Sequence, residues 1–130
     1  MIVLDASAAV DWLLQTPAGR QIDRRIFARN ESLHAPHLLD LEVAQVLRRL
    51  VREGMISSPR ADHAVEDLLD LRVTRYPHFL LLPRIWQLRL NLSAYDAAYV
   101  ALAEKLPGTL ISRDRRLQSA RGHAAQIEVF

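Results

Sequence analysis

The 130-residue chain contains no cysteine, and this absence and several others narrow the class of protein it can belong to. Without cysteine there is no disulfide framework, no thiolate metal site and no cysteine nucleophile. No apolar run approaches the roughly 20 residues that a membrane-spanning helix needs. The N-terminal stretch also lacks the basic start and long apolar segment of a signal peptide. These absences predict a cytoplasmic protein with no membrane segment.

Glycine is scarce, at four residues, and the glycine-dependent catalytic motifs are missing. There is no phosphate-binding loop, no G-x-G-x-x-G and no G-x-S-x-G, so nucleotide-dependent enzymes and serine hydrolases lack their signatures here. A phosphatase with an aspartyl nucleophile would want a second acid two residues after the first. Ser7 stands at that place after Asp5.

Lysine is almost absent, because 16 of the 17 basic residues are arginine and the other is Lys105. Arginine binds phosphate in bidentate fashion, so nucleic acid is one interpretation of this bias. A coding sequence rich in G and C would produce the same bias. Composition alone does not decide between the two.

Short apolar strands alternate with helix signals along the chain, which predicts a parallel sheet built from right-handed β-α-β crossovers. The length predicts one domain covering residues 1–130. The expected strands are 2–4, 32–35, 73–76, 109–112 and 125–130. The expected helices are 6–14, 17–30, 36–53, 58–71, 81–91, 94–106 and a short basic helix that ends near residue 122.

Proline and apolar patterning suggest how some of these helices begin and pack. Pro36 is expected to open the helix over 36–53, and Ser58-Pro59 to cap and open the next one. The segment 94–106 is apolar nearly all round, so it is expected to be buried. Four aromatic side chains are interpreted as core rather than as platforms for stacking bases, namely Trp12, Trp86, Tyr95 and Tyr99.

Four acids that are far apart in the sequence are each expected where a strand ends or a helix begins. Asp5, Asp96 and Asp114 follow or open apolar segments, and Glu42 flanks the apolar stripe of its helix. In an open parallel sheet the carboxyl ends of the strands share one edge, where ligands bind. The acids are therefore expected to converge. Clustered carboxylates are unfavourable unless protons or cations neutralise them, which favours a site for a hard divalent ion such as Mg²⁺.

Each acid also has a purely structural interpretation. Asp5 and Asp114 could be helix N-caps, and Asp96 forms a capping box with Ser93. Glu42 is expected to be half-buried and could form an ion pair with an arginine from another helix. Taken together, the four acids favour a shared site. The alternative requires that each acid has a purely structural role and that the topology nevertheless brings all four to one edge of the sheet.

Three arginines surround Asp114: Arg113, Arg115 and Arg116. Arginines in the first turn of a helix oppose the dipole preference for acids there, and such local conflicts are expected at functional sites. Binding of a phosphate group beside the metal site would explain them, and a solvated basic turn is the alternative.

Four segments carry a resemblance to a known family. They are the opening IVLDASAAV, Glu42 within LLDLEVAQVLRRL, Asp96 within LSAYDAAYVALAE, and LISRDRRL around Asp114. In order and spacing, over essentially the whole chain, the sequence resembles PIN-domain ribonucleases and, among them, the VapC toxins of bacterial toxin–antitoxin modules. The resemblance implies a single PIN domain, with a five-stranded parallel sheet, helices on both faces and a carboxylate pocket for Mg²⁺ or Mn²⁺. It also implies a homodimer and a VapB-type antitoxin as partner.

The resemblance places Asp5, Glu42, Asp96 and Asp114 at the family's four acidic positions. Its implied function is a Mg²⁺-dependent endoribonuclease toxin that hydrolyses phosphodiester bonds in RNA. Asp5 and Asp96 are the expected direct ligands, while Glu42 and Asp114 complete the shell or position the attacking water. Hydroxyl groups that could orient a ligand or water are those of Ser7 and Ser112.

Two other functions remain open from the residues alone. One is a phosphatase-like phosphoryl-transfer domain on a similar sheet, which would need a second acid after the nucleophile and a suitably placed lysine. The other is a non-catalytic interaction module whose acids only cap helices and bind no metal.

Overall fold

The structure, a computed structural model that describes residues 1–130, is organised around a five-stranded sheet in the order β3-β2-β1-β4-β5. Every pair of neighbouring strands is parallel. The predicted parallel sheet is therefore confirmed. The strands are β1 (Ile2–Leu4), β2 (Leu33–Pro36), β3 (Val73–Tyr76), β4 (Thr109–Ser112) and β5 (Gln126–Val129).

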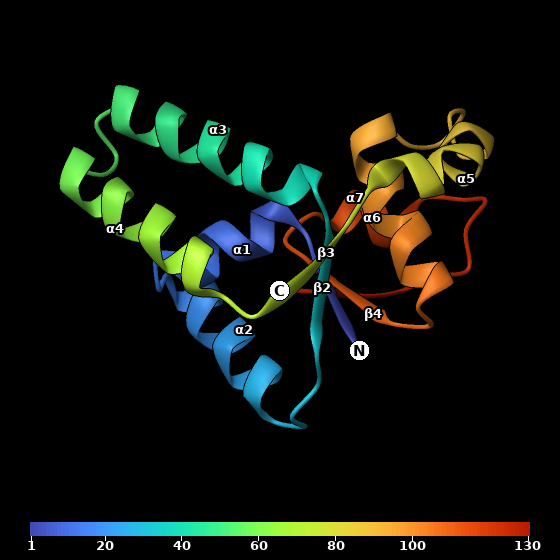
Figure 1. Cartoon of the computed structure of the whole chain (residues 1–130), viewed down its shortest axis with the longest axis horizontal. Helices are drawn as coiled ribbons and strands as arrows, with labels where there is room; N and C mark the ends of the chain where they lie inside the picture. Colours follow the sequence, from blue (N-terminus) through green and yellow to red (C-terminus); the bar gives the residue numbers. More distant parts are fainter.

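Helices cover both faces of the sheet, as expected (Figure 1). One face carries α1 (Ala6–Leu13), α2 (Pro17–Phe27), α3 (Leu38–Arg52) and α4 (Ser58–Asp70). The other carries the 3₁₀ helix η1 (His78–Leu81) and the helices α5 (Leu82–Gln87), α6 (Ala94–Lys105) and α7 (Arg115–Ser119). No helix is long and apolar enough to cross a membrane.

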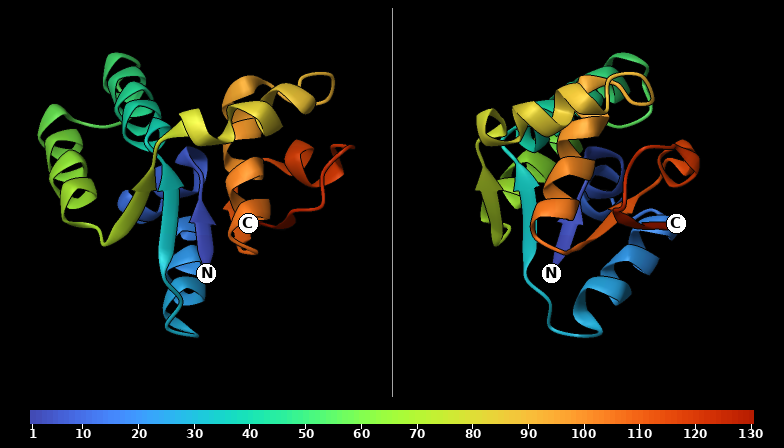
Figure 2. Two further views of the ribbon diagram at one scale, coloured as in Figure 1. Left: turned by 45° about the vertical axis from the view of Figure 1, so that its right-hand side comes forward. Right: turned by 90° about the vertical axis from the view of Figure 1, so that its right-hand side faces the viewer.

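The strand order reverses at the centre of the sheet, between β1 and β4. From β1 the chain builds outward through β2 to β3 on one side, and then returns to place β4 and β5 on the other. The strands visible in Figure 2 all point toward the end where α3 and η1 begin. In such sheets the crevice at the reversal, outside the carboxyl ends of the strands, is where ligands bind.

The core is almost entirely apolar. Of 40 buried residues, the only polar or charged ones are Asp5, His34 and Ser112. Helix α6 is buried continuously from Ala97 to Ala103, which confirms the prediction from its pattern. His34 has partners on both ring nitrogens, Ser32 Oγ at 2.7 Å and Tyr76 Oη at 2.8 Å, so it is a satisfied core histidine. Asp5 and Ser112 lie instead at the carboxyl ends of β1 and β4.

Several local predictions were wrong. Pro36 does not open α3 but ends β2, where it pairs with Tyr76 of β3 and with no residue of β1. Its missing N–H therefore costs no ladder bond to β1, and α3 starts at Leu38. The cap of α4 is Ser57 instead of Ser58.

The segment expected as one helix over 81–91 is divided between η1 and the short α5, which ends at Gln87. Of the four aromatics predicted to be core, Trp12 and Tyr99 are buried. Trp86 and Tyr95 are not, at 65% and 62% exposed. Trp86 lies near the end of the short α5, where the Arg89 guanidinium stands 4.6 Å from the centre of its ring, and Tyr95 lies in the first turn of α6.

Gly19 allows α1 and α2 to cross closely. A Cβ added at this position would stand 1.8 Å from the main-chain oxygen of Asp11, a backbone atom that cannot rotate away. Glycine is therefore required here by the approach of two backbones. The same crossing brings Asp11 and Thr16 together, and Thr16 caps α2 by accepting a hydrogen bond from the Gly19 N–H.

We predict that Gly19→Ala destabilises the fold by about 1–3 kcal/mol or more, because the two helices must move apart to admit the methyl group. Urea unfolding of the two proteins measures the difference. Gly108→Ala is the control and should cost less, because a Cβ there comes no closer than 3.1 Å to its nearest neighbour, the main-chain oxygen of Met1. A Gly19→Ala protein as stable as the parent would show that the helices do not pack as described.

Candidate active site

The four acids singled out in the sequence line one hollow at the reversal point of the sheet. Its volume is about 310 Å³. Asp5 comes from the end of β1, Glu42 from α3, Asp96 from the first turn of α6 and Asp114 from the loop after β4. The remaining lining residues are Ala6, Ser7, Gln45, Val46 and Tyr99.

Asp5 is the most buried of the four, at 6% exposed. It is the N-cap of α1, and its Oδ1 accepts hydrogen bonds from the Ala8 N–H at 2.9 Å and from the Ser7 hydroxyl at 2.6 Å. The capping interpretation was therefore right, but it does not compete with a role in the site. The cap aims the carboxylate along the edge of the sheet, because the residue that ends β1 also begins α1.

Glu42 is half-buried and has no arginine partner. Its Oε1 accepts a hydrogen bond of 2.6 Å from the hydroxyl of Tyr99 on α6. The alternative of a structural ion pair is thus not what the fold contains. This hydrogen bond joins the helices that bring Glu42 and Asp96 to the hollow, and it fixes the orientation of the glutamate.

Asp96 lies three residues after the cap of α6. The Ser93 hydroxyl accepts a hydrogen bond from the Asp96 N–H at 3.1 Å, which confirms Ser93 as the N-cap. That bond uses the main chain of Asp96, so its carboxylate can face the hollow.

Asp114 is the cap of the short α7 and is closely paired. Its Oδ1 accepts from the Arg116 N–H at 2.9 Å, and the Arg116 guanidinium lies 2.7 Å from Oδ2. The side chain of Arg116 is 88% exposed, so this cation stands at the rim of the hollow in water. Arg115 is exposed as well.

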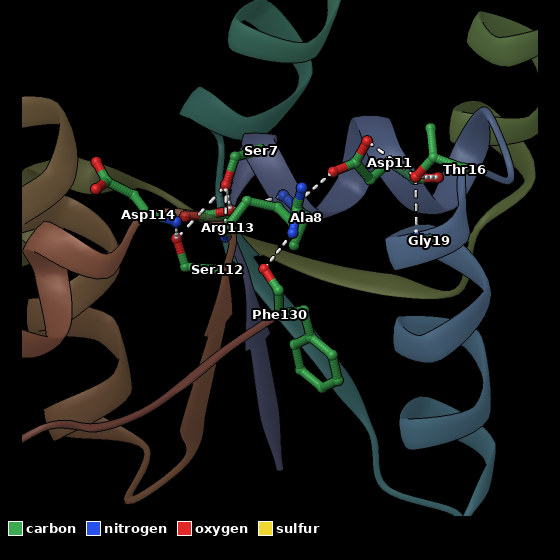
Figure 3. Close-up of polar contacts among 10 residues, drawn as sticks. Ser7, Ala8, Asp11, Thr16, Gly19, Ser112, Arg113, Asp114 and Phe130 are labelled. Atoms are coloured by element: carbon green, nitrogen blue, oxygen red, sulfur yellow. Dashed lines mark hydrogen bonds and ion pairs between the residues drawn. The ribbon is translucent and has the colours of Figure 1, made fainter.

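The Arg113 side chain points elsewhere, toward Asp11 of α1, at 2.6 Å, and the carbonyl oxygen of Phe130. Figure 3 shows these contacts together with Ser7 and Ser112. The main-chain N–H of Arg113 donates to Ser7 Oγ at 3.0 Å, and the N–H of Asp114 donates to Ser112 Oγ at 3.0 Å. Both predicted serines therefore hold the backbone of the loop after β4.

The electrostatics of the hollow divide the acids into two kinds. Burial raises the pKa of Asp5, Glu42 and Asp96 above the ordinary carboxyl range. The negative charge of Asp96 adds to the rise at Asp5 and at Glu42, and that of Asp114 adds to the rise at Asp96. Asp114 differs, because its hydrogen bonds to the Arg116 side chain lower its pKa. Ionisation of these three carboxyls is therefore less favourable than in water, and a bound cation would make it more favourable.

The donors fit a hard divalent ion that keeps part of its water shell. They are all oxygens, but no three histidine, aspartate or glutamate side chains form a group that could hold an ion by protein ligands alone. Mg²⁺ commonly binds through one or two carboxylates, several waters and a substrate phosphate. Asp5 and Asp96 are the carboxylates that fit this role, since each has a raised pKa and neither is in an ion pair.

A larger hollow, of about 510 Å³, lies at the opposite edge of the sheet, beside the starts of β2 and β3. Its acids do not form a comparable cluster. Glu31 is paired with Arg25 at 2.6 Å, and Asp70 lies on the exposed end of α4. Size alone would point to this hollow, but the chemistry favours the smaller one.

Three residues of interest were not recognised from the sequence. Tyr99 was assigned to the core, yet its buried hydroxyl holds Glu42; its position three residues after Asp96 on one helix face was the available signal. Gln45 of α3 lines the hollow. Asp11 pairs with Arg113, and nothing local in the sequence links these two residues.

The arrangement defines a class of protein: a doubly wound parallel α/β domain with an acidic cluster at its reversal point. The chain belongs to the PIN domain family, whose family model matches residues 2–122.

Curated relatives match nearly the whole chain. Ribonuclease VapC9 of Mycobacterium tuberculosis is 47% identical over 117 residues, covering 90% of this chain and 88% of the relative. Ribonuclease VapC12 of the same organism is 45% identical over 129 residues, covering 99% of this chain and 98% of the relative.

Solved structures share the fold. PAE2754 from Pyrobaculum aerophilum has a TM-score of 0.71 at 25% identity, covering 98% of this chain and 83% of that one. VapC20 of Mycobacterium tuberculosis, described as a toxin that cleaves the sarcin–ricin loop, has a TM-score of 0.68 at 16% identity, with coverage of 92% and 94%. VapBC2 of Rickettsia felis, bound to promoter DNA, has a TM-score of 0.64 at 13% identity, with coverage of 99% and 98%.

The raised pKa of Asp5 predicts how stability depends on pH in the absence of divalent ions. Above about pH 4, the Asp5 carboxyl is ionised in the unfolded chain, as an ordinary carboxyl is. The native state still favours the protonated form, because its pKa for this group is raised. Stability from this group is therefore present below that pH and is lost as pH rises. We predict that Asp5→Asn, which keeps the helix cap, melts higher than the parent at pH 7 in EDTA. The advantage should shrink toward pH 4.

Asp114→Asn is the matched control of opposite sign. Because pairing lowers the pKa of Asp114, its contribution is present above the ordinary carboxyl pKa and is lost as pH falls. Its removal should lower the melting temperature slightly at pH 7, since Arg116 is mostly exposed. A melting temperature of Asp5→Asn below that of the parent at pH 7 would contradict the assignment of unrelieved charge to Asp5.

Proposed function

We propose that this chain is a Mg²⁺-dependent endoribonuclease that hydrolyses phosphodiester bonds in RNA, acting as the toxin of a type II toxin–antitoxin system. The observation that carries the proposal is the meeting of Asp5, Glu42, Asp96 and Asp114 in one hollow at the reversal point of the sheet. The relatives named as ribonucleases support the reaction class and RNA as the substrate. The whole chain, residues 1–130, would form one PIN domain.

Asp5 and Asp96 would hold Mg²⁺, or Mn²⁺ in its place, with Glu42 and Asp114 completing the shell or holding the attacking water. When bound, the ion supplies Lewis acidity to the scissile phosphate and lowers the pKa of a bound water. The chain contributes the orientation of these groups. Ser7 holds Asp5 and Tyr99 holds Glu42, each through a hydrogen bond of 2.6 Å.

RNA phosphate would meet the exposed cations on α7. Arg115 and Arg116 lie in the first turn of this helix, directly after Asp114. The exposed guanidinium of Arg116 can leave Asp114 for a phosphate at little cost, because an ion pair in water contributes little stability. Asp114 would then be free to act on the metal or the water, so substrate binding and completion of the site would be coupled.

The phosphatase alternative loses support from the geometry. Ser7 stands where the second acid is needed, and the single lysine, Lys105, ends α6 at the edge of the sheet opposite the acids. A non-catalytic interaction module would bind no metal, so a metal-binding experiment distinguishes it from the proposed nuclease.

We predict that Asp5→Asn and Asp96→Asn each abolish RNA cleavage and toxicity while leaving the fold intact, because each change keeps the shape of the side chain and removes one charge. The measurement is cleavage of total RNA by purified proteins in Mg²⁺ or Mn²⁺, beside circular dichroism. Asp62→Asn, at an exposed position on α4, is the matched control and should cleave normally. Cleavage at the parent rate by either site variant would remove that residue from the site.

Metal binding is monitored in the same proteins by thermal unfolding. An ion that binds only the native state at a hundredfold excess over Kd adds about 2.7 kcal/mol. Mn²⁺ should raise the melting temperature of the parent and of Asp62→Asn but not of Asp96→Asn. If Mn²⁺ and Mg²⁺ leave all three unchanged, the interaction module becomes the better account.

A VapB-type antitoxin is proposed as the protein partner. Its support is the similarity to VapC ribonucleases and the fold shared with VapBC2. An antitoxin that silences the nuclease directly would cover the acidic hollow with a basic side chain. The cytoplasm is proposed as the compartment in which toxin, antitoxin and RNA meet.

A homodimer is proposed through the stretch from η1 to the start of α6. It exposes an unusual number of large apolar side chains: Phe79, Leu80, Leu82, Trp86, Leu90 and Tyr95. Leu82 and Trp86 are one turn apart on α5 and share a face. Such a patch on a soluble domain marks an interaction surface, and a second copy would bury the same residues on both sides.

We predict that the parent sediments as a dimer and that Trp86→Glu sediments as a monomer with an unchanged circular dichroism spectrum. Leu69→Glu is the control, because Leu69 is as exposed, at 75%, but lies on α4. A monomeric parent, or a dimer that survives Trp86→Glu, would mean that this surface serves another contact.

A further inference from the structure

The side chain of Arg113 makes hydrogen bonds within the fold, whereas an arginine that binds phosphate needs its guanidinium free for the ligand. Its Nε donates to Asp11 Oδ2 at 2.6 Å, and its Nη1 donates to the carbonyl oxygen of Phe130 (Figure 3). Asp11 is itself held, because its Oδ1 accepts a hydrogen bond of 3.0 Å from Thr16. The guanidinium is therefore bonded to α1 and to the end of the chain, although the side chain is 40% exposed. The side chain of Arg116 is 88% exposed and pairs only with Asp114.

The main chain of Arg113 makes a second connection to the same helix. Its N–H donates to Ser7 Oγ at 3.0 Å, and the Ser7 hydroxyl donates to Asp5 Oδ1 at 2.6 Å. Ser7 and Asp11 are four residues apart on α1, so they lie one above the other on one face of the helix. Arg113 is thus attached to two successive turns of α1, once through its main chain and once through its side chain.

Two attachments one helical turn apart constrain the loop more than one does. The loop is also held by the Phe130 N–H, which donates to the Ser112 carbonyl oxygen at 3.1 Å. The ion pair with Asp11 adds a second tie to α1, which restricts rotation of the loop about the Ser7 hydrogen bond. Because Ser112 and Asp114 are the neighbours of Arg113 in sequence, their positions relative to Asp5 depend on the same constraint.

We infer that Arg113 and Asp11 form a positioning pair for the active site. The pair sets the distance between the loop that carries Ser112 and Asp114 and the start of α1, which carries Asp5 and Ser7. It also presents the Arg113 N–H to Ser7, so the proton of the Ser7 hydroxyl is directed to Asp5. This inference rests on the proposed function, and it removes Arg113 from the arginines that contact RNA.

The test compares Arg113→Gln, Asp11→Ala and the double variant with the parent. Mn²⁺ affinity is measured by calorimetry in the absence of RNA, and cleavage of one RNA substrate gives kcat and KM. Groups that orient metal ligands typically contribute tenfold to hundredfold in affinity or rate, and we expect losses of about that size in both single variants. KM for RNA should stay unchanged. The double variant should be no worse than either single one, because the two residues act as a unit.

Asp11→Ala distinguishes positioning from phosphate contact. It removes the ion-pair partner of the Arg113 guanidinium and leaves the bond to Phe130, so a phosphate-binding arginine would bind RNA as well as before or better. A result in which Arg113→Gln raises KM while Asp11→Ala leaves Mn²⁺ affinity and kcat at parental values would overturn the inference. A parent that binds no Mn²⁺ and cleaves no RNA would instead be a failure of the proposed function.

Arg84→Gln is a closely matched control. Arg84 also joins one carboxylate, that of Glu104 at 2.7 Å, and one carbonyl oxygen, that of Gly122 at 2.9 Å, but at the far end of α6. Its loss should leave Mn²⁺ affinity unchanged, and an equal loss in this variant would show that the effect reflects general destabilisation and would defeat the inference. Arg113→Lys keeps a cation for Asp11 and should recover part of the affinity. If Arg113→Gln does not fold, Asp11→Ala and Arg113→Lys still decide the question.

Discussion

The charge of Asp5 is the constraint on which the rest of the site depends. A carboxylate that is 6% exposed ends the central strand of an otherwise apolar sheet, at the point where the strand order reverses. Burial opposes that charge, and the nearby Asp96 opposes it further. Two hydrogen-bond donors, the Ala8 N–H and the Ser7 hydroxyl, stabilise the carboxylate in part. The rest of its negative charge has no compensating cation nearby. A site with excess negative charge, raised carboxyl pKa values and space for water is suited to a hydrated divalent ion. The same imbalance is expected to lower the stability of the metal-free protein at neutral pH.

The arginines near the hollow are held in different ways, which their shared sequence context conceals. Arg113, Arg115 and Arg116 are close neighbours around one acid, yet the first is attached to Asp11 and the end of the chain. All three side chains reach solvent, but Arg116 is far more exposed, at 88% against 40% for Arg113. A cation that is bonded to a helix can set geometry but cannot follow a substrate. A cation paired in water can exchange its partner for a phosphate at little cost. On the proposals made above, this contrast would separate a positioning arginine from the arginines that contact substrate within one loop.

Much of this could be predicted from sequence, because the strands and the convergence of the acids follow from local patterns and the rules of parallel sheets. The strand over 109–112 agrees residue for residue, and the burial of α6 followed from its apolar pattern. The failures involve information that is not local. Pro36 was misplaced because strand pairing decides where a proline is tolerated. Trp86 was assigned to the core because its exposure depends on what packs over α5. The pairing of Asp11 with Arg113 spans most of the chain, and no local pattern in either segment reveals it.

The central claim is that the four acids form one metal site, and the most direct test is to map where a metal ion binds. Fe²⁺ replaces Mg²⁺ at oxygen sites, and with ascorbate and peroxide it cuts the polypeptide backbone close to the bound ion. If the four acids form one metal site, cuts will appear together near Asp5, Glu42, Asp96 and Asp114, four places far apart in sequence. Excess Mg²⁺ will suppress all of them in parallel. Cuts that fall elsewhere, or that persist in excess Mg²⁺, would contradict the account, because the acids would then meet in the fold without forming a metal site.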